Sequence, residues 1–94
     1  MLFVISCIDK PDHLHVRLDN RPAHVEYLKS QGDKLISAGP TLADDGETMN
    51  GSVIIMELAS KSEAEAFCTA DPYNKAGLFE STSIRAWKKV LPAD

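Results

Sequence analysis

The chain contains four short stretches in which apolar and β-branched residues follow one another over the length of a β-strand. The first, LFVISCI, and the third, VIIMEL, are apolar at almost every position, so neither has a polar face. The second ends at Gly39-Pro40, and in the fourth Ile84, Ala86 and Val90 alternate on one face. The predicted strands are residues 2–8, 34–38, 53–58 and 82–91.

Between the first two strands the apolar residues have helical spacing. Leu14, Leu18, Val25 and Leu28 lie four, seven and three residues apart, and Gly32 is the expected left-handed cap. Pro22 interrupts this stretch: proline costs about 3 kcal/mol inside a helix but suits a first helical position. The sequence therefore predicts either a kink near Asn20-Arg21 or two helices in series, the second beginning at Pro22.

A second helical segment follows the third strand. Ser60 is placed to cap it, and Glu63 three residues later completes a capping box. Asp71-Pro72 ends the helix. The residues expected on its buried face are Ala64, Phe67 and Cys68.

The resulting order, β-α-β-β-α-β, predicts a single α+β domain over residues 1–94 with the ferredoxin-like arrangement, a four-stranded antiparallel sheet covered on one face by two helices. Two helices cannot cover both faces. Because the strands at residues 2–8 and 53–58 are apolar on both sides, the second face needs a cover. A second copy of the same sheet is the simplest candidate, so we expect a homodimer packed through the sheet faces.

Composition and charge narrow the classes of function. Ten Lys and Arg against fourteen Asp and Glu give a net charge of −4, which opposes nucleic-acid binding. Neither a membrane span of roughly 20 apolar residues nor the basic start and cleavage site of a signal peptide is visible. We therefore expect a cytoplasmic protein without a membrane partner. Cys7 and Cys68 are interpreted as small core residues.

His24 is the first candidate for chemistry. On a straight helix His24 and Arg17 lie within about 20° of each other, at the edge of the apolar stripe, and Arg21 projects near its middle, where a charge needs a partner. If a helix starts at Pro22, His24 lies in its first turn, a setting that suits an anion and favours a neutral imidazole able to accept a proton. The alternative is a half-buried histidine with solvated arginines.

Asp71 is the second candidate. Asp-Pro commonly starts a helical turn, with the aspartate as N-cap; alternatively, the carboxylate orients an imidazole and stabilises its charged form.

Tyr73 offers a hydroxyl for orientation or serves as a packing aromatic. Ser37 and Gly39 end the second strand, where a glycine permits close approach of a ligand or simply makes a turn. The spacing of the histidines predicts no metal site.

These residues resemble the YciI-like (YCII-related) family over essentially the whole chain. The matching segments are MLFVI at residues 1–5, Asp9-Lys10, Arg17, RPAH at residues 21–24, AGP at residues 38–40, Gly51-Ser52, DPY at residues 71–73, Ala76-Gly77 and KKV at residues 88–90. The resemblance implies a dimeric α+β barrel and a pocket that holds a His-Asp pair, here His24 and Asp71. Related proteins on this fold include small cofactor-free enzymes similar to muconolactone isomerase and to dehydrochlorinases.

The first functional hypothesis is a lyase or isomerase that uses no cofactor and acts on a small anionic organic molecule. His24 would move the proton and Asp71 would orient it and balance its charge. Arg17 and Arg21 would hold a carboxylate or phenolate; the groups expected to position the substrate are Ser37, Gly39 and Tyr73. The second hypothesis is a binding module that senses an anionic metabolite or docks on a protein partner without catalysis.

Overall fold

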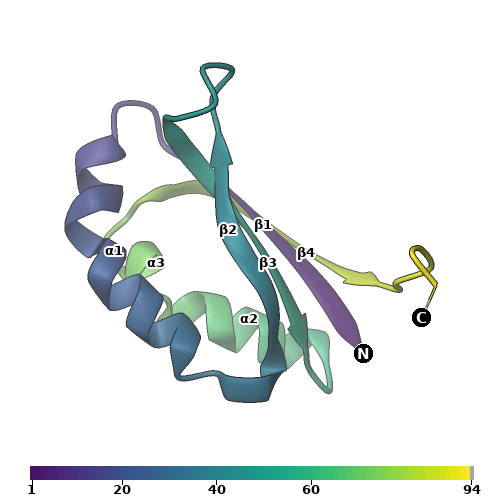
Figure 1. The fold of residues 1–94 in the computed structure, drawn as a ribbon. Helices are drawn as coiled ribbons and strands as arrows, with labels where there is room; N and C mark the ends of the chain where they lie inside the picture. The colour runs from purple at the N-terminus through teal and green to yellow at the C-terminus, as the bar shows by residue number, and fades with distance from the viewer. Residues whose placement is uncertain (94) are drawn as a thin grey trace.

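The computed structural model describes residues 1–93 and has the predicted order of elements (Figure 1). The elements are β1 (Leu2–Asp9), α1 (Leu14–Lys29), the 3-10 turn η1 (Gly32–Lys34), β2 (Leu35–Leu42), β3 (Met49–Glu57), α2 (Lys61–Ala70), α3 (Pro72–Lys75) and β4 (Phe79–Trp87). The strands form one antiparallel sheet in the order β2-β3-β1-β4, with β1 and β3 in the centre. This is the ferredoxin-like α+β fold.

The helices lie together on one face of the sheet and enclose the core (Figure 1). Alternate residues of the central strands point toward them. Phe3 pairs with Met56 and Ile5 with Ile54 across the β1–β3 ladder, and all four side chains are at most 3% exposed. The helices add Ala64 and Phe67 to this cluster. The predicted buried face of the second helix is thereby confirmed, although Cys68 is only partly buried.

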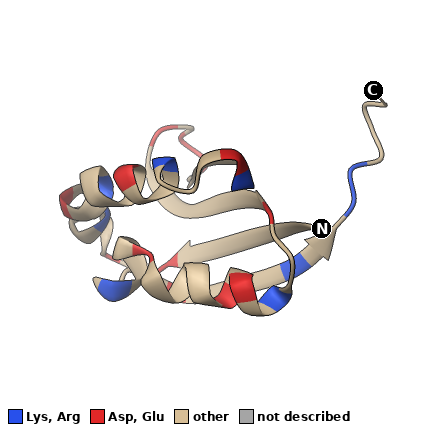
Figure 2. Cartoon of the chain, turned by 90° about the horizontal axis from the view of Figure 1, so that it is seen from below, with Lys and Arg blue, Asp and Glu red and all other residues tan. Residues whose placement is uncertain are grey.

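The other face of the sheet carries no helix (Figure 1), and the central strands place apolar residues on it. Val4 pairs with Ile55, and Leu2 pairs with Trp87, which is 42% exposed. Figure 2 shows that the charged residues gather on the helices and loops and leave the strands nearly free of charge. The expectation that the central strands are apolar on both faces is confirmed, and the homodimer that it suggests stays a prediction.

The prediction that a second helix begins at Pro22 is wrong, because α1 runs from Leu14 to Lys29 with Pro22 inside it. A proline in a helix leaves the carbonyl four residues earlier without its backbone donor. Here that residue is Leu18, which is 51% exposed, and Pro22 is exposed too, so water can reach this side of the helix. His24 therefore lies well inside α1 and not in a first turn, and the argument from a helix N-terminus does not apply to it.

The last strand also differs from its predicted limits. β4 covers Phe79–Trp87 and not residues 82–91, so Val90 lies beyond the sheet and is 69% exposed. Ile84 and Ala86 do pair with the inward-facing Ile5 and Phe3. The strand begins earlier than predicted because Gly77, with φ +74°, follows the C-cap Ala76 of α3 and ends the turn two residues before Phe79.

The predicted cap of the second helix is present. Ser60 Oγ accepts a hydrogen bond from the Glu63 amide at the start of α2, while the Glu63 side chain accepts from the amide of Ala59. Gly32 has the expected left-handed conformation, with φ +59°, but the C-cap residue of α1 is Ser30, and Gly32 begins η1 instead. Within residues 1–93, no helix combines the length and apolar character that a membrane span requires.

Candidate functional site

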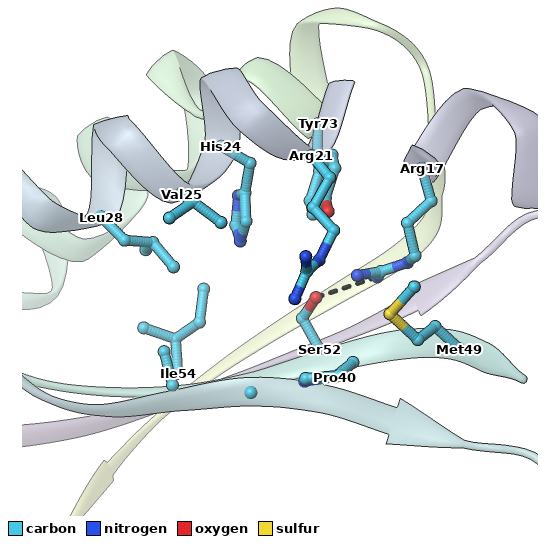
Figure 3. A pocket seen from close by; sticks show the side chains of 12 residues that line it. Arg17, Arg21, His24, Val25, Leu28, Pro40, Met49, Ser52, Ile54 and Tyr73 are labelled. Carbon is cyan, nitrogen blue, oxygen red and sulfur yellow. Dashed lines mark hydrogen bonds between the residues drawn. The ribbon is translucent and has the colours of Figure 1, made fainter. Parts of the chain in front are cut away.

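A cavity of about 120 Å³ lies between α1 and the strands β2 and β3 (Figure 3). The helix side of the cavity is lined by polar groups, including Arg17, Arg21 and His24. Figure 3 shows His24 and Arg21 pointing from the helix toward the sheet, where Ser52 lies opposite. The apolar side chains along its wall are Val25, Leu28, Pro40, Met49 and Ile54.

Helical spacing explains why α1 supplies three of these groups. Arg17, Arg21 and His24 are four and three residues apart, which places them on one side of a helix. Arg17 is 2% and His24 7% exposed, and these are the buried residues of α1. The sequence placed Arg21 at the centre of the buried stripe, but Arg21 is exposed. The stripe had been located from Leu14 and Leu18, which are themselves 40% and 51% exposed.

His24 and Asp71 form a buried pair. Nδ1 of His24 lies 2.8 Å from Oδ1 of Asp71, and their side chains are 8% and 3% exposed. Because an ionised carboxylate only accepts hydrogen bonds, Nδ1 carries the proton and Nε2 of the neutral ring is the free acceptor.

The Nε2 atom of His24 is open to the cavity. Every fully buried side-chain nitrogen and oxygen within residues 1–93 has a hydrogen-bond partner, and none is recorded for Nε2. That atom therefore keeps contact with solvent, although the residue as a whole is buried. His24 also lines the cavity. A proton acceptor of fixed orientation thus faces the space where a small molecule would sit.

Asp71 holds the imidazole and caps a helix with the same oxygen. Its Oδ1 also accepts a hydrogen bond of 2.9 Å from the amide of Tyr73, at the start of α3. The two interpretations of Asp71 drawn from the sequence are therefore compatible. Pro72 at the first helical position fixes the turn in which this carboxylate is held.

Tyr73 packs against the imidazole. The rings of Tyr73 and His24 are stacked at 3.9 Å with 17° between their planes, and Arg17 lies 4.6 Å from the centre of the Tyr73 ring. Burial raises the pKa of Tyr73, and the positive charges of Arg17 and Arg21 oppose that shift. Tyr73 therefore keeps its proton at neutral pH and lines the cavity with a neutral hydroxyl.

Arg17 is neutralised inside the protein. Its Nε and Nη2 donate to the two carboxylate oxygens of Asp9 at 2.7 and 2.9 Å, and Nη2 also donates to Ser52 Oγ at 2.9 Å. Burial alone would lower the pKa of Arg17, but the hydrogen bond and charge of Asp9 raise it. The expectation that Arg17 holds an anion is thus limited to its remaining donors on Nη1.

Arg21 is the cation that remains available to a ligand. It lines the cavity, and no salt bridge to it occurs within residues 1–93, in contrast to Arg17. An anionic group in the cavity would meet this charge with little competition from carboxylates, because the acidic groups nearby, Asp9 and Asp71, are paired already. The structure therefore favours Arg21 over Arg17 as the anion-binding residue.

The structure separates Ser37 from the other predicted site residues. Ser37 pairs with Ile55 and so lies on the open face of the sheet, whereas Ala38, one residue later, pairs with the inward-facing Ile54. Ser37 is absent from the cavity lining and Gly39 is part of it. The expectation that Ser37 positions a substrate in this cavity is corrected, because strand alternation turns its side chain away.

Asp9 and Ser52 are site residues that were named from the sequence only as part of the family resemblance, without a role in the site. Asp9 is the last residue of β1 and fixes Arg17. Ser52 is a buried polar side chain on the inward register of β3, which continues with Ile54 and Met56. A serine on a core-facing register needs a hydrogen-bond partner, and this was the available signal.

Gly51 lets β3 approach its neighbours closely enough to place Ser52. A Cβ atom at this position would collide with the carbonyl oxygen of Cys7 on one side and with the Thr41 hydroxyl on the other. Only glycine avoids both contacts. At Gly39, by contrast, a Cβ would meet nothing within 4 Å, so the bare fold does not require a glycine there.

No three His, Cys, Asp or Glu side chains of residues 1–93 are grouped as a metal site would need. The two thiols are far from reactive: burial raises the pKa of Cys7 to about 11 and that of Cys68 to about 12. The expectation that catalysis needs no cofactor stays a prediction.

Comparison with known proteins identifies relatives over the whole chain. Residues 1–88 match the YCII-related domain. Protein YciI of Escherichia coli O6:H1 is 41% identical over 98 residues, which cover 97% of this chain and all of the relative. An uncharacterised protein of Haemophilus influenzae is 32% identical with the same coverage.

Solved structures agree with this assignment. The chain superimposes with a TM-score of 0.90, at 42% identity and full coverage of both chains, on the 5-chloro-2-hydroxyhydroquinone dehydrochlorinase of Burkholderia phenoliruptrix AC1100 in complex with 2,5-dihydroxybenzoquinone. An antibiotic biosynthesis monooxygenase, 15% identical with a TM-score of 0.55 over 96% of this chain and 99% of its own, shares only the fold. The domain match, the identities and the full-length coverage together place this chain in the YCII-related family.

Proposed function

We propose that this protein is a small-molecule enzyme of the lyase or isomerase type, which moves a proton on a small anionic ring compound without a cofactor. The observation that carries the proposal is the orientation of His24: Nδ1 is held by the buried Asp71 carboxylate, and Nε2 is left open toward a cavity. This is the geometry of a general base whose tautomer is fixed by a second residue.

The proposed reaction begins when His24 Nε2 accepts a proton from the substrate. The imidazolium that forms is balanced by the Asp71 carboxylate 2.8 Å from Nδ1. The electron pair left on the substrate then expels an anionic leaving group, which completes an elimination, or shifts so that His24 returns the proton at another atom, which completes an isomerisation. General acid–base catalysis of this kind typically contributes about 10²–10⁴-fold in rate.

The size and charge of the cavity favour a single ring that carries oxygen substituents. About 120 Å³ is close to the roughly 150 Å³ of cavities known to hold benzene. Arg21 supplies a positive charge, and the apolar wall of Val25, Leu28 and Ile54 suits the ring itself. The likeness to a dehydrochlorinase in complex with 2,5-dihydroxybenzoquinone supports an oxygenated six-membered ring as the substrate class.

The test is chloride release from 5-chloro-2-hydroxyhydroquinone, the compound named for that structural relative, together with a panel of small hydroxylated ring acids. His24→Asn keeps a donor at the position of Nδ1 but has no group at Nε2, so it should fold, bind 2,5-dihydroxybenzoquinone and lose at least a hundredfold in turnover. Lys29→Gln is the matched control, since it changes an exposed residue of the same helix.

The competing function is a binding module without catalysis. The wild-type protein would then bind ring acids in the cavity but convert none of the panel, and His24→Asn would bind them with the same affinity. Full turnover by His24→Asn would reject the proposed mechanism directly.

The proposal includes a homodimer formed through the open face of the sheet. The exposed apolar residues Ile8 and Trp87, at 55% and 42% exposure, support it. Trp87 is the sole tryptophan of the chain, so its fluorescence should shift to shorter wavelength as the protein concentration rises and the ring becomes buried. Sedimentation of a monomer at micromolar concentration would contradict the dimer.

A further inference from the structure

Ser52 has a hydroxyl hydrogen that the protein does not use. Ser52 is 2% exposed and lines the cavity from β3. Its Oγ accepts a hydrogen bond from Arg17 Nη2 at 2.9 Å, drawn as the dashed line in Figure 3. Arginine has donors only, so in this bond the serine oxygen must be the acceptor. Within residues 1–93 the hydroxyl donates to no protein acceptor, and its hydrogen is left for something else.

The partner that orients this hydroxyl is itself immobile. Asp9 binds Arg17 through both carboxylate oxygens, and the Tyr73 ring lies 4.6 Å from the guanidinium carbon. Both hydrogens of Nη2 are engaged, one by Asp9 and one by Ser52. The backbone beneath Ser52 is equally fixed, because Gly51 packs against β1 and β2 with no room for a side chain. The Ser52 oxygen is therefore preorganised.

The position of Ser52 complements that of His24. Figure 3 shows Ser52 on the sheet side of the cavity and His24 on the helix side, both directed into the same space. Nε2 of His24 can only accept a hydrogen when the ring is neutral, whereas the hydroxyl of Ser52, which already accepts a bond from Arg17, has its own hydrogen free to donate. A molecule between them meets one acceptor and one donor.

We infer that Ser52 is a substrate-binding residue, which donates its hydroxyl hydrogen to a carbonyl or phenolate oxygen on the ring compound whose proton His24 accepts. This inference rests on the proposed function for the identity of the ligand. The Arg17 charge behind Ser52 strengthens the donor. The site thereby selects rings with an acceptor oxygen on the Ser52 side over rings that carry only carbon there.

The experiment compares the affinities of two probes, 2,5-dihydroxybenzoquinone and toluene, a ring of similar size without oxygen. Ser52→Ala should reduce the affinity for 2,5-dihydroxybenzoquinone roughly ten- to hundredfold, as expected for a lost hydrogen bond to a charged acceptor, and leave toluene binding unchanged. Ser52→Thr keeps the hydroxyl, so the ratio of the two affinities should stay as in the wild type. Ser62→Ala, at an exposed serine of α2, is the matched control.

Two binding results would overturn the inference: an unchanged ratio of the two affinities in Ser52→Ala, or failure of the wild-type protein to bind 2,5-dihydroxybenzoquinone. The Arg17 Nε–H resonance, which reports the bond to Asp9, is followed in parallel. If it moves in Ser52→Ala, the effect is indirect and the inference fails. Because only binding is measured, a catalytic failure of His24 leaves this result intact, and a failure here leaves the role of His24 untouched.

Discussion

Two substitutions of Asp71 separate its capping role from its charge. In Asp71→Asn, the side-chain oxygen can still accept from the Tyr73 amide and from His24 Nδ1, both of which now bond to Asp71 Oδ1. In Asp71→Ala neither bond can form. The two variants thus share the loss of a carboxylate and differ in the loss of hydrogen bonds.

The expected magnitudes follow from burial. Losing the N-cap costs about 1 kcal/mol, and leaving the buried His24 donor without a partner adds roughly 1–3 kcal/mol, so Asp71→Ala should lose about 2–4 kcal/mol of unfolding free energy. For a chain of this length that lowers Tm by about 8–32 °C. Asp71→Asn should lose no more than about 1 kcal/mol, yet its turnover should fall about a hundredfold or more, because nothing balances the imidazolium.

Thermal denaturation followed by circular dichroism gives the first quantity, and chloride release or turnover of a ring acid gives the second. Equal destabilisation of the two variants would show that the shared oxygen does not carry the stability. Wild-type turnover in Asp71→Asn would refute the charge-balancing role, even if the stability result came out as expected.

Three further predictions concern the surroundings of the site. Arg17→Met leaves the Asp9 carboxylate, only 6% exposed, without a counter-charge, and urea denaturation should show a loss of about 3–5 kcal/mol; a loss below 1 kcal/mol would mean that Asp9 finds water instead. Gly51→Ala forces a Cβ against the Cys7 carbonyl and should lower both Tm and the affinity for a ring compound. An unchanged affinity would show that Gly51 does not contribute to the site. Alkaline pH should destabilise the protein. The thiol pKa is near 9.0 in the unfolded chain but about 11 for Cys7 and about 12 for Cys68 in the folded protein. The unfolded state therefore loses its protons first, and stability falls as the pH rises above about 9. The urea midpoint at pH 10 should lie below that at pH 7, and the gap should narrow when both cysteines are replaced by alanine.

The order of elements was predictable because periodicity reports which residues face the core. The strand runs 2–8 and 53–58 became β1 and β3, and the capping pattern at Ser60 located α2. The predicted limits of the helices and strands were less accurate where solvent exposure decides whether a residue is tolerated. Pro22 is tolerated in α1 since that side of the helix is open to water, and no sequence pattern records which side faces water.

Only part of the candidate site could be predicted from the sequence. His24 and Arg17 were placed together by helical spacing, and the structure buries both. Pairing with Asp71, 47 residues away, came only from the resemblance, because spacing along a chain cannot reveal contacts between distant elements. Ser37 was misplaced by the same limit: its face depends on the register of β2 against β3, which includes an irregularity between Leu35 and Ser37.

The first helix is attached to the sheet in an unusual way. Its buried residues are Arg17 and His24, so side chains of the pocket, together with Tyr27 and Leu28 packed against the core, dock the helix on the rest of the molecule. Pocket occupancy and helix docking are then one equilibrium, and a bound ring compound should slow amide hydrogen exchange along α1 while the central strands stay as protected as before. A substitution of Arg17 or His24 that changes what the pocket recognises would therefore also change what holds the first helix in place.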